Sequence, residues 1–211
     1  DHRSPTRTPS TTHQLRWPQP HNPCSGFGVK APSLVALYDH SPERWPTRRS
    51  SLLGIPIRHR ILQNSRAISA SSFAWPQHVF LSPEAFTSPE QLAEQITHEM
   101  CHCWLYLMEE VAPVQTASER VFRLPSGTSQ RDAAEVLGAL HVAVTLQILW
   151  GAIDAPTSLR QTRIDDLRSY AEGCIALLKG EAHRMLTAGG KSLTGDLATL
   201  HHQLTAKAAT G

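Results

Sequence analysis

The segment His98-Glu99-Met100-Cys101-His102 combines the residue types of a metal-binding helix. In an α-helix, residues four positions apart lie on one face, one turn apart, so both imidazoles can reach a single metal ion. Glu99 lies between them, where its carboxylate could activate water or orient a ligand. We therefore expect His98 and His102 to be metal ligands and Glu99 to be a catalytic residue.

A catalytic metal site needs a third protein ligand and an open coordination position. No histidine follows His102 before His141, which excludes the extended HExxHxxGxxH motif. His141 lies in an apolar stretch, where an unsatisfied imidazole would cost about 1 to 3 kcal/mol and a metal would satisfy the ring. We predict His141 as the third ligand, with Glu135 and Glu119 as alternatives. Small residues near His141, such as Gly138, would let its helix approach the HExxH helix closely.

Capping residues, prolines and hydrophobic periodicity predict the elements that must position these side chains. Ser88 and Pro89 mark the start of a helix that should run to about residue 110. Ser129 marks the start of a second helix, which is apolar on nearly every side and should run to about residue 150. Further helices are predicted over residues 33–38, 158–186 and 195–207, and short strands over residues 55–62, 67–71 and 78–82.

The order of these elements predicts an α+β protein, with a small antiparallel sheet followed by a helical bundle. The position of the HExxH helix after the strands resembles the layout of zincin-like metalloenzymes. Residues 1–32 hold six of the 15 prolines and little apolar periodicity, so we expect a Pro-rich tail or an irregular wrap. Residues 33–211 are expected to form a single metalloenzyme domain.

Composition argues against several partners. Twenty Lys and Arg against 18 Asp and Glu give a net charge of +2, without the basic and aromatic stripe that is typical of nucleic-acid binding. No uninterrupted apolar run approaches the roughly 20 residues of a membrane-spanning helix. Four irregularly spaced cysteines do not make a disulfide framework, so we expect a soluble protein of the reducing cytoplasm. Cys101 and Cys103 should pack in the core, and His201 and His202 should lie on the surface.

The stretch over residues 66–150 resembles the HExxH-type peptide β-hydroxylases, which are non-haem iron, 2-oxoglutarate-dependent enzymes that modify ribosomally made peptides. The shared features are the Ile-Ser-x-Ser strand at residues 68–71, a strand ending in Leu-Ser, the HExxH helix, and the Gly-x-Leu-His element that ends at His141. The resemblance implies that His98, His102 and His141 hold Fe(II). It also implies that Arg131 or Arg123 pairs with the distal carboxylate of 2-oxoglutarate, as a bidentate guanidinium can. The substrate would be a ribosomally made precursor peptide.

The same motif also suits a zinc metallopeptidase in which Glu99 is the general base. Iron sites of the oxygenase type more often use two histidines and one carboxylate than three histidines. Both functions require an extended peptide beside the sheet. We expect the strand at residues 78–82 to bind it by edge pairing.

Overall fold

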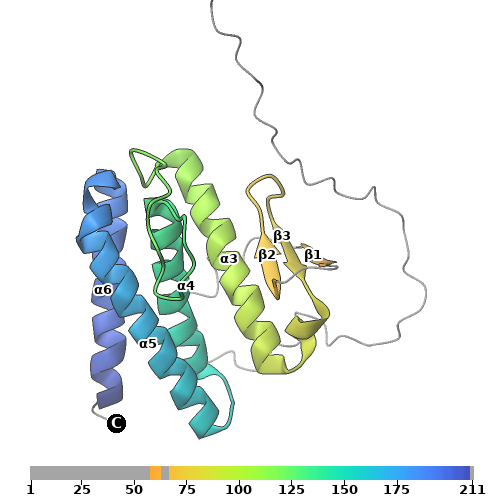
Figure 1. Cartoon of the computed structure of the whole chain (residues 1–211). Coiled ribbons are helices and arrows are strands. Elements are labelled where there is room, and N and C mark those ends of the chain that lie inside the picture. Colours follow the sequence, from red (N-terminus) through yellow and green to blue (C-terminus); the bar gives the residue numbers. More distant parts are fainter. Residues whose placement is uncertain (1–57, 63–66, 210–211) are drawn as a thin grey trace, which may run out of the picture.

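The computed structural model describes residues 58–62 and 67–209. Within this part, a three-stranded sheet packs on one side of the helix that carries the HExxH motif, and three further helices lie on its other side (Figure 1). The α+β prediction is confirmed, whereas the predicted tail over residues 1–32 and the helix over residues 33–38 lie outside the described residues. The elements are β1 (Arg58–Ile61), β2 (Ser69–Ser71), β3 (His78–Leu81), η1 (Pro83–Phe86), α3 (Pro89–Val111), α4 (Ala133–Ala152), α5 (Thr157–Lys179), η2 (Glu181–Met185) and α6 (Ala188–Ala209).

The sheet is mixed, so the prediction of an antiparallel sheet is wrong. Its strand order is β1-β3-β2, with β2 antiparallel and β1 parallel to β3. β2 and β3 form a hairpin, and β1 pairs with the other side of β3. Because β3 is paired on both sides, residues 78–82 cannot bind a peptide by edge pairing, and that expectation is also wrong. Among the described strands, the edges are β1 and β2.

Helix α3 begins where the capping residues predicted. The Ser88 side chain accepts a hydrogen bond from the Gln91 amide at 3.1 Å, and Pro89 occupies the first turn. The side of α3 that faces the sheet is apolar and packs on alternate residues of β3, whose side chains point to one face of the sheet. This small core consists of Val79, Leu81, Ala85, Leu92, Ile96 and Met100.

Helix α4 is the central helix of the bundle and is buried on most sides, as its apolar sequence predicted. It begins later than predicted, because Asp132 and not Ser129 is the N-cap, in a reciprocal capping box with Glu135. Within the described residues, α4 is the one helix long and apolar enough to cross a membrane, and 72% of the apolar window is buried inside the protein. The core helix of a soluble protein meets the same criterion.

The two C-terminal helices differ from the prediction at their junction. α5 ends at Lys179 and is followed by the short helix η2, and α6 begins at Ala188 rather than at residue 195. Gly190 therefore lies in the first turn of α6 and does not terminate a helix. A Cβ at Gly190 would lie 2.1 Å from the Val114 carbonyl oxygen, so this contact requires glycine.

The adjacent histidines of α6 lie on different faces. His201 is 1% exposed, and its Nδ1 lies 3.3 Å from Nε2 of Gln147 in α4. The prediction of a surface position is therefore wrong for His201, whereas His202 is exposed as expected.

We expect Gly190→Ala to lower the free energy of unfolding by about 3 kcal/mol, the upper end of the usual cost of overpacking, because backbone cannot move aside as a side chain can. Gly195→Ala is the matched control in the same helix. Gly195 is exposed, and no atom lies within 4 Å of the position that an added Cβ would take, so alanine there should stabilise by about 0.5 to 1 kcal/mol. Urea unfolding of both variants checks this, and equal effects would contradict the close contact.

Candidate metal centre

A cavity of about 940 Å³ lies among α3, α4, α5, strand β2 and the connection over residues 112–132. The HExxH residues His98, Glu99 and His102 all line it. Two arginines of the connection, Arg120 and Arg131, line the same cavity. The structure thus brings the motif and cationic side chains to one open space.

The two motif histidines converge as the helix spacing predicted. Their Nε2 atoms are 3.2 Å apart, and their rings are inclined at 62°. Two nitrogens bound to one ion at about 2.0 to 2.1 Å would be separated by roughly 3 to 3.4 Å. Burial, followed by the charges of His98, His141 and Arg131, lowers the pKa of His102 to about 4, so this ring is neutral at pH 7. Neutral imidazole is the form that binds metal, and the pair therefore fits two positions of a metal site.

The neighbouring helix fixes the orientation of His102. Gly138 of α4 lies against this ring, and a Cβ at Gly138 would be 3.6 Å from His102 Nδ1 and 3.1 Å from Leu105 Cδ2. The Tyr106 ring stacks on His102, with ring centroids 6.4 Å apart. The predicted close approach of the two helices at a small residue is confirmed.

Glu99 is connected to the sheet. Its side chain is 3% exposed, and its Oε1 accepts a hydrogen bond of 2.6 Å from the Ser69 hydroxyl of β2. The same hydroxyl lies 2.7 Å from Oε1 of Gln95, one turn earlier on α3. The catalytic candidate of the motif is therefore held by an edge strand, a contact that the sequence did not predict.

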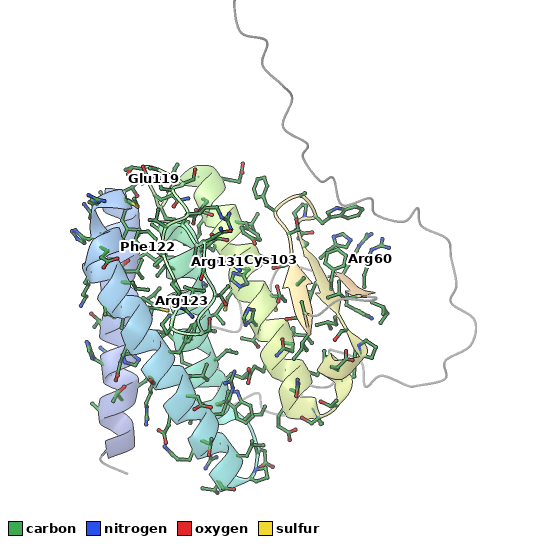
Figure 2. All side chains as sticks on the ribbon, viewed as in Figure 1. Arg60, Cys103, Glu119, Phe122, Arg123 and Arg131 are labelled. Carbon is green, nitrogen blue, oxygen red and sulfur yellow. The ribbon has the colours of Figure 1, made fainter. Side chains whose placement is uncertain are left out.

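Of the two arginines proposed for the co-substrate, only Arg131 lines the cavity. Its backbone is fixed by two hydrogen bonds with Phe122, and its Nη1 donates to Glu135 at 2.6 Å. Its Nε is buried and has no hydrogen-bond partner in the described part of the chain. Arg123 instead donates through Nε to the Gly127 carbonyl at 3.0 Å and is exposed. Figure 2 shows both arginines on the connection that covers α4.

Sequence reasoning did not single out Arg120, which also lines the cavity. Its Nη2 donates to Glu135 at 2.8 Å, and its Nε donates to the Gln130 carbonyl at 3.0 Å. Its neighbour Glu119, an alternative third ligand, is exposed and does not line the cavity. Adjacent residues in an irregular connection give no periodic signal from which their directions could be predicted.

His141 does not line the cavity, although Val142 does. Successive residues of a helix project about 100° apart, so two adjacent side chains need not face the same space. The His141 Nδ1 is buried and has no hydrogen-bond partner among residues 58–62 and 67–209. Burial lowers the pKa of this ring, and the Cys101 backbone partly opposes the shift.

Glu135, the other alternative, does line the cavity, and its charge acts on His102. Partial burial acts to raise the pKa of Glu135, but the Asp132 amide and Arg131 outweigh it, so the pKa lies below its usual value. In the described ranges, no group of three or more His, Cys, Asp or Glu side chains is placed so that it could hold a metal ion.

Comparison with models of protein families gives no match for this sequence, and no curated protein matches it.

Proposed function

We propose that this protein is a non-haem iron, 2-oxoglutarate-dependent oxygenase that hydroxylates the β-carbon of a residue in a ribosomally made peptide. The observation that carries the proposal is one cavity that contains both the His98–His102 pair, with Nε2 atoms 3.2 Å apart, and Arg131 with a buried, unpaired Nε. The reaction consumes one O₂ and one 2-oxoglutarate. One oxygen atom enters the peptide C–H bond as hydroxyl, and the other enters succinate as CO₂ is released.

Each role follows from a contact of the side chain concerned. His98 and His102 would hold Fe(II), which when bound supplies the activation of O₂. Arg131, whose side chain lines the cavity, would bind the distal carboxylate of 2-oxoglutarate through a charge-assisted hydrogen bond from its guanidinium group. Its pairing with the Phe122 backbone and with Glu135 keeps the guanidinium at the cavity before the oxoacid binds.

We further propose Glu135, rather than His141, as the third protein ligand. Both residues act on His102, but of the two only Glu135 lines the cavity, and the pKa of its carboxyl lies below the usual value. Two histidines and one carboxylate are the common ligand set of Fe(II) oxygenases. Metal binding would then draw the carboxylate away from its two arginines, which would leave Arg120 and Arg131 more available to the oxoacid.

We predict that Glu135→Gln weakens Fe(II) binding by at least about 10-fold, because an amide is a poorer ligand than a carboxylate. Glutamine keeps the length needed to cap the Asp132 amide, so α4 should keep its N-terminal cap. His141→Gln is the matched variant and should change the affinity by less than about 3-fold. Anaerobic calorimetric titration with Fe(II) measures both. If His141→Gln weakened Fe(II) binding more than Glu135→Gln did, the ligands would instead be His98, His102 and His141.

Strand β2 is the element best suited to bind an extended peptide. It contributes Ser69 and Ser71 to the cavity, and it is an edge of the described sheet. A peptide added to this edge would run beside α3 and the histidine pair, with its backbone held by strand hydrogen bonds.

The alternative, a zinc metallopeptidase, is supported by Glu99, which lines the same cavity as the histidine pair. The two functions are distinguished by co-substrate dependence. With Fe(II), O₂ and 2-oxoglutarate, the oxygenase should release succinate in amounts that exceed the enzyme. Cleavage of a peptide library by the zinc-loaded protein, without O₂ or 2-oxoglutarate, would instead establish the peptidase.

A further inference from the structure

Ser69 lies at a junction between the sheet and the HExxH helix. Its hydroxyl is within hydrogen-bond distance of two acceptors, Oε1 of Glu99 at 2.6 Å and Oε1 of Gln95 at 2.7 Å. A serine hydroxyl has one proton and can donate it to only one acceptor at a time. Both contacts are satisfied when the Gln95 amide is turned round, since amide oxygen and nitrogen are interchangeable in position.

The resulting chain of hydrogen bonds has a definite direction. The Gln95 amide donates to the Ser69 hydroxyl, and the hydroxyl donates to the Glu99 carboxylate. The Gln95 amide can be turned to donate, whereas both Glu99 oxygens serve as acceptors, so the proton of Ser69 belongs with Glu99. This bond uses one acceptor position of Oε1, and Oε2 keeps both of its own.

We infer that Ser69 is a positioning residue, which holds the Glu99 carboxylate in the cavity and couples the peptide-binding edge of β2 to the metal-binding helix. The inference rests on the proposed function, because the contact is assigned a role in the same metal site. Without the hydroxyl, Glu99 would be a buried carboxylate that has lost its strand partner, and its side chain would be free to leave the position beside the histidine pair.

The strand offers a matched control. Ser71 lies two residues further along β2, on the same face, and lines the same cavity. Its buried hydroxyl is beside the Cys103 thiol and makes no full hydrogen bond in the part of the chain that the structure describes. Ser71→Ala therefore removes a hydroxyl from the same strand and cavity without touching Glu99.

The test compares Ser69→Ala, Ser69→Thr and Ser71→Ala in the full chain. For Ser69→Ala we expect kcat for 2-oxoglutarate turnover to fall by about 10-fold, because Glu99, which would orient a ligand in the cavity, loses the strand partner that holds it. Affinity for Fe(II) and KM for 2-oxoglutarate should change by less than about 2-fold. Threonine keeps the hydroxyl and should recover most of kcat. Ser71→Ala is the control for the position of the Glu99 carboxylate and not for turnover, because Ser71 also lines the cavity.

A second readout, which does not require activity, is the NMR chemical shift of the Glu99 carboxylate carbon. It is measured in protein labelled with ¹³C-glutamate, with and without Zn(II). The Glu99→Gln variant assigns the signal. Ser69→Ala should move this signal, whereas Ser71→Ala should not. If Ser69→Ala does not fold, Gln95→Met, which removes only the outer link, should move the signal less and in the same direction. An unmoved signal, or an equal shift in Ser71→Ala, would overturn the inference. Absence of turnover in the unmodified protein would count against the proposed function alone, since the carbon signal still tests the contact.

Discussion

Replacing His98 with alanine should weaken Fe(II) and Zn(II) binding by at least about 100-fold. The loss of one ligand leaves a single imidazole, His102, on the helix, and even the loss of an indirect partner of a ligand costs about 10- to 100-fold in metal affinity. His98 and His102 contact each other and line the cavity, so the variant loses one of the two nitrogens that converge there. Metal content after purification and anaerobic titration both measure this effect.

The control is His183→Ala, because His183 is exposed, lies in η2 and does not line the cavity. Its metal affinity should equal that of the unmodified protein. If His98→Ala binds Fe(II) as tightly as this control, the histidine pair is not the metal centre, whatever the reaction.

Replacing Arg131 with alanine should weaken 2-oxoglutarate binding by about 10- to 100-fold. This corresponds to the loss of about 1.5 to 3 kcal/mol for a hydrogen bond to a charged group. Fe(II) binding should not weaken, because Arg131 pairs with Glu135 and does not contact the histidine pair directly. Titration of the Fe(II)-loaded protein with 2-oxoglutarate measures the change.

Arg123→Ala is the matched control, since Arg123 belongs to the same connection but donates to the Gly127 carbonyl. Its affinity for 2-oxoglutarate should change by less than about 3-fold. A larger loss in Arg123→Ala than in Arg131→Ala would mean that the oxoacid binds outside the cavity described above.

The parts of the fold that could be predicted are those set by local sequence. Ser88 and Pro89 determine the start of α3 through a cap and a fixed backbone angle, and both act within one turn. The convergence of His98 and His102 follows from helical spacing alone, which is why it was predicted and is observed. The burial of α4 follows from its composition in the same way.

The parts that could not be predicted depend on contacts between distant segments. Val142 lines the cavity and His141 does not, and the spacing of apolar residues does not determine which side of α4 faces the cavity when nearly every side is apolar. The local sequence at Gly190 favours a helix end, whereas its actual role depends on the Val114 carbonyl, which belongs to another connection. The contact of Ser69 with Glu99 likewise depends on the order of the strands in the sheet. The sequence pattern predicted only an antiparallel sheet and did not predict that order.

The measurement that tests the central claim most directly is the visible absorption spectrum of the Fe(II)-reconstituted protein under anaerobic conditions, before and after addition of 2-oxoglutarate. We predict a new charge-transfer band that is absent in His98→Ala and needs higher 2-oxoglutarate concentrations in Arg131→Ala. The account would be contradicted if no band appeared in the unmodified protein while the purified chain carried stoichiometric zinc and cleaved peptides in a reaction that Glu99→Gln abolished.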